Sequence, residues 1–154
     1  MRSLPLPTDT QASVFALCLG ATNDPGLQAR LTAIAASLAA SGVTYHANAT
    51  AASLHHVERR PSVGGVTKAE LTGLYEEHLS KTSGAARAVY DRIRSAAPNN
   101  RCPLCGVGSV AHCDHHLPKS RYPDLSILPF NLVPACHFCN DKKRAKYPAT
   151  AGQQ

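Results

Sequence analysis

The sequence predicts an α+β fold that is mostly helical, with helices in the N-terminal part and a small motif rich in cysteine and histidine after them. Apolar residues recur at helical spacing in three stretches before residue 98, whereas both Cys-x-x-Cys pairs follow it. Between the two pairs, an Asp-His dipeptide lies in a segment expected to form a short strand. At 154 residues the chain suits one compact domain, or a small domain with a helical extension. We expect a helical region at 1–98, a compact unit at 99–148 and a disordered tail at 149–154.

Three helices are expected in the N-terminal region. The first begins at Pro25 and ends at Gly42, because proline suits the first helical turn and glycine commonly follows the last. The second begins at Thr67, which fits a capping box with Glu70. The third runs from about 83 to 97. Their buried faces are expected to be formed by Leu27, Leu31, Ile34 and Leu38, then by Leu71, Leu74, Tyr75, His78 and Leu79, and then by Ala86, Val89, Tyr90 and Ile93.

The composition predicts a modest core and an anionic partner. Apolar residues make up 44% of the chain but aromatic residues only 5%, so much of the apolar content is alanine. A bound metal is a common supplement to such a core. The net charge of +6 is uneven: residues 1–80 carry five Lys and Arg against six Asp and Glu, whereas residues 81–154 carry eleven against four. The positive charge lies with the Cys and His residues, which favours a nucleic-acid partner over a solvated basic face.

The cysteine pattern and the start of the chain indicate a cytoplasmic protein with reduced thiols. Four of the six cysteines fall in two Cys-x-x-Cys pairs, and no secretory signal is expected before them. The early apolar run at 14–19 is too short to span a membrane and has no clear cleavage pattern. We therefore expect no membrane association.

The paired Cys-x-x-Cys motifs predict a structural zinc site. Zn²⁺ prefers four tetrahedral ligands, and a Cys-x-x-Cys turn lets two thiolates bind one ion from a single tight loop. Cys102 and Cys105 form one such turn, and Cys136 and Cys139 form the second after an interval of thirty residues. Gly106 suits the sharp turn of the first loop. A redox pair is the alternative, but redox chemistry needs no second pair to match the first.

The residues between and beside these turns predict hydrolytic chemistry on a phosphodiester. Such a reaction needs an activated water and neutralisation of charge at the phosphate. A histidine suits the first task, and a hard divalent cation held by carboxylate and amide oxygens suits the second. His115 can supply the base, while Asp114 and Asn140 can supply the oxygens. Because adjacent strand residues point to opposite faces, Asp114 and His115 can share one site only if the strand turns or ends there, as Pro118 suggests.

These residues, in this order, closely resemble the HNH endonucleases, the ββα-metal (His-Me finger) nucleases, in the branch where a zinc knuckle braces the motif. The resemblance covers about residues 100–147, a third of the chain. It implies that His115 is the general base and that Asp114 and Asn140 ligate a catalytic metal. Many relatives have histidine at the position of Asn140, and the amide favours a harder ion, Mg²⁺ or Mn²⁺. Asn131 matches the central asparagine, which fixes the loop that orients the histidine; a plain turn or cap residue would have a similar task.

Other residues of the motif are expected to assist. His116 supports the site, contacts phosphate or only sits in the sheet. A helix is expected from Pro134 to about residue 146, and its basic side chains would follow a nucleic-acid backbone rather than read bases. The residues expected to contact the backbone are Lys119, Arg121, Lys142, Lys143, Arg144 and Lys146.

The leading functional expectation is a metal-dependent endonuclease that hydrolyses DNA phosphodiester bonds. The resemblance implies products with 5′-phosphate and 3′-hydroxyl ends. One alternative is a zinc-knuckle module that binds nucleic acid without cleaving it. Another is a nuclease subunit that is active only with a partner, for instance in phage defence or as part of a mobile element. The helices of region 1–98 are expected to pack or to bind a protein partner.

Overall fold

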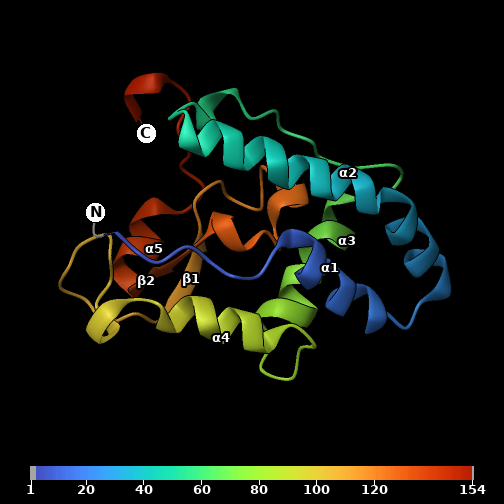
Figure 1. The fold of residues 1–154 in the computed structure, drawn as a ribbon, viewed down its shortest axis with the longest axis horizontal. Coiled ribbons are helices and arrows are strands. Elements are labelled where there is room, and N and C mark those ends of the chain that lie inside the picture. The colour runs from blue at the N-terminus through green and yellow to red at the C-terminus, as the bar shows by residue number, and fades with distance from the viewer. Residues whose placement is uncertain (1–2, 154) are drawn as a thin grey trace.

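The computed structural model describes residues 3–153, and Figure 1 shows their arrangement. A small antiparallel hairpin lies between a long helix on one side and a shorter helix on the other. Among the described residues, no helix combines the length and apolar character needed to cross a membrane. The helices are α1 (Gln11–Gly20), α2 (Pro25–Thr50), α3 (Lys68–Gly73), α4 (Arg87–Ser95) and α5 (His137–Lys143), and the strands are β1 (His112–His115) and β2 (Leu132–Ala135).

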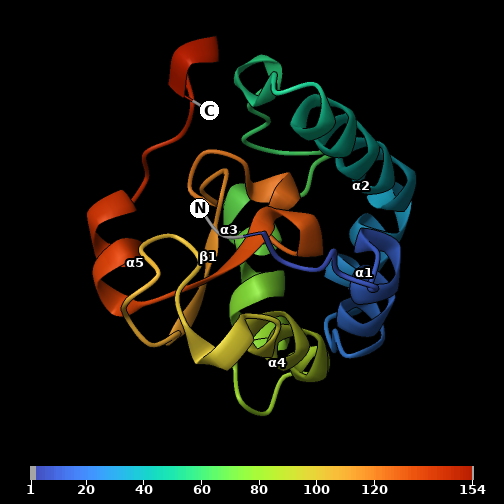
Figure 2. The ribbon, with the colours of Figure 1, turned by 60° about the vertical axis from the view of Figure 1, so that its left-hand side comes forward.

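Two helices hold the hairpin, and Figures 1 and 2 agree on this arrangement. Helix α4 packs against both strands, α5 packs against β1, and α1 packs against α2. After α3 the chain continues as a π-helical segment, Leu74–Ser80, which contacts both α1 and α4. The main apolar core joins these helices to Cys113 of β1 and Leu132 of β2. The hairpin is therefore anchored in the helical core rather than attached to its surface.

Local capping signals in the sequence are confirmed. Asp24 caps α2 by accepting hydrogen bonds from two N–H groups of its first turn, with Pro25 as the first helical residue. Thr67 and Glu70 form the expected capping box at the start of α3. The apolar faces expected for the three helices also lie in the core, except that His78 and Leu27 are only partly buried.

The expected end of the first helix at Gly42 is wrong. Helix α2 continues to Thr50, and Gly42 lies within it against the side chains of Gln11 and Leu128. A β-carbon at Gly42 would come within 2.4 Å of Gln11 Oε1 and 3.4 Å of Leu128 Cδ1. The glycine thus permits a close approach of neighbouring elements, a role that the local sequence does not distinguish from a helix end. Gln11 belongs to helix α1, which was not predicted from the sequence.

The third expected helix is shorter than the predicted span of 83–97. It begins at Arg87, because the preceding residues form turns in which the Gly84 N–H donates to Lys81 O and the Ala86 N–H donates to His78 O. Helix α4 ends at Ser95. The turns bring Gly84 against the His78 backbone, where a side chain has no room.

Gly84→Ala is expected to destabilise the protein by about 2 kcal/mol, in the range of overpacked sites. A β-carbon at this position would lie 2.2 Å from His78 O, and a backbone atom cannot move aside as a flexible side chain can. Gly73→Ala is the matched control, because no atom lies within 4 Å of its added β-carbon. Urea unfolding measures both free energies; equal stabilities for the two variants would contradict the close contact.

The hairpin pairs Asp114 with Val133 and His115 with Leu132. The expectation of a helix from Pro134 to about 146 is wrong, since Pro134 belongs to β2 and faces Cys113, and α5 spans only His137–Lys143. A proline costs no ladder bond here, because the backbone groups of Cys113 bond elsewhere. The Cys113 N–H donates to the Tyr90 hydroxyl at 3.1 Å, and the Cys113 carbonyl accepts from the Tyr75 hydroxyl at 3.3 Å.

A second apolar cluster lies under the long connection between the strands. It joins the C-terminal half of α2 and the segment after it to the connection itself, through Tyr45, Leu54, Val57, Leu117, Tyr122, Leu125 and Leu128. The segment expected to be a disordered tail includes a short 3-10 turn at Ala151–Gln153, and Gln154 lies outside the described residues.

Candidate active site and four-cysteine metal site

Asp114 and His115 are the last two residues of β1, and both line the same cleft. The strand ends at His115, so the alternation that would separate two neighbouring side chains does not continue past this point. After it, the His116 N–H donates to Asn131 O at 2.8 Å. The end of the strand therefore allows a carboxylate and an imidazole to face one space.

The His115 ring is fixed by two contacts. Its Nε2 lies 2.8 Å from Ser126 O, and because a carbonyl only accepts, Nε2 carries the proton and donates it. The ring also packs edge-on against Tyr75, with centroids 4.5 Å apart. Burial lowers the pKa of His115 to about 4, so the ring is neutral near pH 7 and Nδ1 keeps its lone pair. The side chain is in the state that a general base requires.

Asp114 faces a cation from helix α5. Lys143 Nζ lies 3.3 Å from Asp114 Oδ2 and donates to His115 O at 2.5 Å, so one ammonium group contacts both residues of the pair. Burial raises the pKa of the Asp114 carboxyl, while the charge and hydrogen bond of Lys143 act against that shift. The Asp114 side chain is 11% exposed, so it can still be reached from the cleft.

The cleft has a volume of about 660 Å³ and is open to one side of the hairpin. Asn140, from the middle of α5, lies in its wall together with Asp114 and His115. Three of the residues predicted for the catalytic site thus meet in one hollow although they come from a strand and a separate helix. The carboxylate of Asp114 and the amide of Asn140 are hard oxygen donors, which suit Mg²⁺ or Mn²⁺.

Cations from three elements surround the cleft. Lys119 and Arg144, both predicted to contact phosphate, line it, and Lys119 is also paired with Glu76. Arg87 and Arg94 of α4 also line it, and both pair with Asp91 of the same helix. Sequence reasoning did not assign these two arginines to the site, because they belong to a helix outside the motif and only the fold brings them near. A cleft of this charge suits an anionic substrate.

Asn131 holds the long connection in place and is completely buried. Its Oδ1 accepts from the Leu117 N–H at 2.8 Å, and its Nδ2 donates to Leu117 O at 2.9 Å and to Leu125 O at 3.2 Å. Ser126, whose carbonyl orients His115, follows directly in this connection. Asn131 is therefore a positioning residue that does not line the cleft.

Asn131→Ala is expected to cost about 2–3 kcal/mol of stability, because it leaves the buried N–H and carbonyl of Leu117 without partners. Asn23→Ala is the control, since that side chain is exposed and a surface change of this kind stays within about 0.5 kcal/mol. Urea unfolding measures both. A neutral Asn131→Ala would show that the connection does not depend on this side chain.

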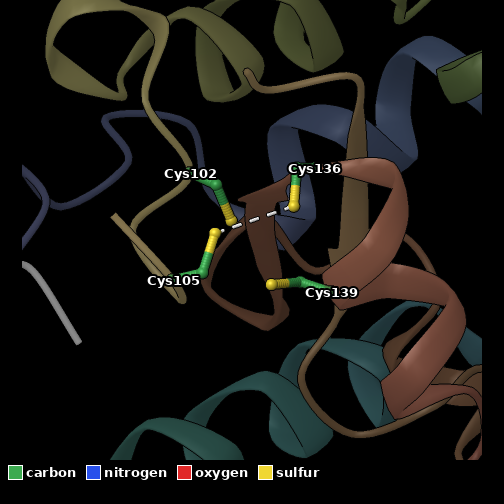
Figure 3. Close-up of side chains that lie close together, drawn as sticks. All are labelled: Cys102, Cys105, Cys136 and Cys139. Carbon is green, nitrogen blue, oxygen red and sulfur yellow. Dashed lines mark hydrogen bonds between the residues drawn. The ribbon is translucent and has the colours of Figure 1, made fainter. Parts of the chain in front are cut away.

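The four cysteines of the two Cys-x-x-Cys turns converge on one point (Figure 3). Their sulfur atoms all lie within 4.8 Å of one another, and Cys105 and Cys136 are 3.8 Å apart. With Zn–S bonds of about 2.3 Å, the edge of a tetrahedron is about 3.8 Å, so this spacing fits a tetrahedral ion. The four residues form a site that can bind a metal such as zinc. The structure thus brings Cys102, Cys105, Cys136 and Cys139 together as the sequence predicts.

The backbone of the first loop favours a thiolate at Cys105 and brings this loop close to the second turn. Hydrogen bonds from the Gly108 N–H, and then from Val107, lower the pKa of Cys105 to about 6. A β-carbon at Gly108 would lie 2.8 Å from Cys136 Sγ, so this glycine lets the first loop approach the second turn. Gly106 has φ 74°, as the tight loop requires. Both loops are shaped around the sulfur cluster.

The remaining predicted residues lie apart from the cleft. His116 is half-buried and lines a second hollow, together with Lys143 and Lys146. Arg121 lies near Tyr147, at 6.0 Å from its ring centroid. Lys142 is exposed on α5 and lines neither hollow. The predicted phosphate contacts are therefore not all gathered at one hollow.

Fold and site together define a small α+β protein in which a four-cysteine metal site adjoins a basic cleft containing Asp, His and Asn. No family model and no solved structure matches the chain. A curated relative, Protein ea31 of Escherichia phage lambda, is 42% identical over 79 residues, which are 51% of this chain and 26% of the relative. The chain thus spans about a quarter of the length of that protein. The likeness is partial and its name states no activity.

Proposed function

We propose that this protein is a metal-dependent endonuclease of the HNH type that hydrolyses DNA phosphodiester bonds. The observation that supports this most is the shared cleft, in which Asp114, His115 and Asn140 meet beneath a rim of cations. The order of a hairpin followed by a helix that packs against its first strand agrees with the ββα arrangement of that family. Four residues resemble the family's motif in order, including the buried Asn131.

His115 acts as the general base in this proposal. The Ser126 carbonyl holds the proton on Nε2, so Nδ1 is the ring atom that can take a proton from the attacking water. Tyr75 restricts the orientation of the ring. After the transfer, the imidazolium is stabilised by the same carbonyl and by the negative charge at the phosphate.

Asp114 and Asn140 are the residues that would hold the catalytic Mg²⁺ or Mn²⁺. When bound, such an ion supplies neutralisation of the phosphate charge and stabilisation of the leaving oxygen. Lys143, 3.3 Å from the Asp114 carboxylate, acts against the rise in its pKa that burial causes. Lys119 and Arg144 would contact the phosphates on either side of the scissile bond.

The four cysteines hold a structural zinc ion in this proposal. Cys136 directly follows β2, and Cys139 directly precedes Asn140 in α5. The ion would therefore fix the turn between the hairpin and the helix that carries the second metal ligand. Zinc gives stability and position here, while the reaction belongs to the cleft.

A supercoiled-plasmid nicking assay tests the proposal. The wild-type protein is expected to convert supercoiled plasmid to the nicked form with Mg²⁺ or Mn²⁺ and to leave it intact when neither ion is added. Ligation and phosphatase treatment of the products are expected to reveal 5′-phosphate and 3′-hydroxyl ends. If the protein binds the plasmid but nicks it with none of the metals tested, the proposal is contradicted.

One observation favours a second candidate, a zinc-knuckle module that binds nucleic acid without cleaving it. The ammonium group of Lys143 already contacts the Asp114 carboxylate, which a binding module could use as a purely structural ion pair. The two candidates differ in a metal titration. A nuclease is expected to bind Mn²⁺ through Asp114 and Asn140, and Asp114→Ala is expected to abolish that binding, whereas a binding module has no such site.

A further inference from the structure

Three segments that are distant in the sequence meet at Tyr147, which does not line the cleft. Arg59 Cζ lies 5.7 Å from the centroid of the Tyr147 ring, and Arg121 Cζ lies 6.0 Å from it. The Tyr122 ring meets Tyr147 edge-on, with centroids 5.8 Å apart. Figures 1 and 2 both show the chain after α5 returning beside the C-terminal end of α2, which places it near the segment that carries Arg59.

The surface around Tyr147 is strongly basic and hollowed. A hollow of about 540 Å³ is lined by His116, Lys143, Lys146 and Tyr147, with no acidic residue in its lining. Lys143 lines this hollow and also contacts Asp114, which lines the cleft. A chain of phosphates that leaves the cleft past Lys143 would therefore reach this surface.

The arginines at this surface have no carboxylate partner within residues 3–153. Arg59, Arg121 and Lys146 form no ion pair there, whereas other cations of the described chain, such as Arg30 and Arg92, are paired with Glu70 and Asp9. Gathering like charges around one ring is unfavourable without a counter-charge. The aromatic face offsets part of this cost, by about 0.5–1 kcal/mol for an exposed pair. Such an arrangement is suited to an external anion.

We infer that Arg59, Arg121 and Tyr147 form a second phosphate-binding site, which holds the nucleic-acid backbone where it passes Lys143 on leaving the cleft. Guanidinium groups donate two parallel hydrogen bonds to a phosphate, and the tyrosine ring keeps both in place. This inference rests on the proposed function, since the ligand is the same nucleic acid that enters the cleft. It gives the region before residue 98 a part in substrate binding through Arg59.

Binding measured without added Mg²⁺ or Mn²⁺ and without chelator, so that the structural zinc stays in place, tests this site separately from cleavage. A fluorescent DNA duplex of about 20 base pairs is titrated with protein at several salt concentrations, and affinity is followed by anisotropy. The Arg59→Gln/Arg121→Gln variant is expected to bind about tenfold more weakly, and the slope of log K against log salt is expected to fall by about 1.8, or about 0.9 for each lost phosphate contact.

Two controls separate the site from general charge and from folding. Arg30→Gln/Lys68→Gln removes the same charge from α2 and α3, away from α5 in Figure 1, and is expected to leave the salt slope unchanged. Tyr147→Phe keeps the ring and is expected to bind like the wild type. Tyr147→Leu keeps apolar volume without the ring and is expected to bind more weakly. Thermal melting of each variant checks that it is folded.

The outcomes distinguish this site from the proposed activity. Unchanged affinity and slope in the Arg59→Gln/Arg121→Gln variant would overturn the second site and leave the nuclease proposal standing. If the Arg59→Gln/Arg121→Gln variant has a reduced salt slope but the wild-type protein never nicks DNA, the second site would be supported and the nuclease proposal would fail. An equal loss in the Arg30→Gln/Lys68→Gln variant would show that only overall charge matters and would also overturn the site.

Discussion

Replacing His115 by alanine is expected to reduce plasmid nicking by at least about 100-fold, because general-base catalysis contributes about 10²–10⁴-fold. The Nε2 proton is held by Ser126 O at 2.8 Å, so this ring presents a neutral Nδ1 for proton transfer. The low pKa of about 4 that burial gives the ring keeps it unprotonated through the neutral range. Nicking is followed over time with Mn²⁺ at a fixed protein concentration, and DNA binding is measured in parallel.

His116→Ala is the matched control, because the neighbouring imidazole lines the other hollow and is not in the cleft. It is expected to nick within about threefold of the wild type, well short of the loss of a general base. Since His115 is buried, its alanine variant must also be shown to melt cooperatively. Nicking by a folded His115→Ala variant at the wild-type rate would contradict the assignment of the base.

Replacing Cys136 by serine is expected to remove the bound zinc and with it the order of the hairpin and α5. Purified wild-type protein is expected to contain about one zinc per chain, and structural zinc sites contribute apparent binding energies of about 10–16 kcal/mol in small peptides. Cys136 is buried, and its sulfur lies 3.8 Å from that of Cys105. Metal content by mass spectrometry and thermal melting measure the effect.

Cys18→Ala is the control for the zinc experiment. Cys18 is fully buried in the helical core, where burial raises its pKa to about 12, and it belongs to no cysteine cluster. Its variant is expected to lose some stability but to keep the metal. A Cys136→Ser protein that retains one zinc and melts like the wild type would contradict the four-cysteine site.

Features that depend on a few adjacent residues could be predicted from the sequence. The capping box of Thr67 and Glu70, the start of α2 at Pro25 and the two Cys-x-x-Cys turns each follow from short-range geometry. The meeting of Asp114, His115 and Asn140 in one cleft also agrees with the resemblance, because the motif encodes their relative order. Local chemistry was sufficient for the caps and the cysteine turns, whereas the cleft was predicted through the resemblance.

Features set by tertiary contacts could not be predicted in the same way. Gly42 has the local pattern of a helix end, but it lies inside α2 and permits close contact with Gln11. Pro134 has the local pattern of a helix start, but it lies in β2 opposite Cys113, whose backbone bonds to two tyrosines. Arg59 and Arg87 carry no local signal, and only the fold brings them beside the motif. The same local sequence pattern thus gives different structures, depending on which residues the fold packs against it.

Single-turnover cleavage of a labelled DNA duplex, with protein in excess and Mn²⁺ present, tests the nuclease most directly because it removes differences in binding. The wild-type protein is expected to cleave the duplex, and His115→Ala and Asp114→Ala are expected to be slower by at least about 100-fold. Equal rates for all three proteins, or no cleavage by a wild-type protein that binds the duplex, would contradict an active site at Asp114, His115 and Asn140.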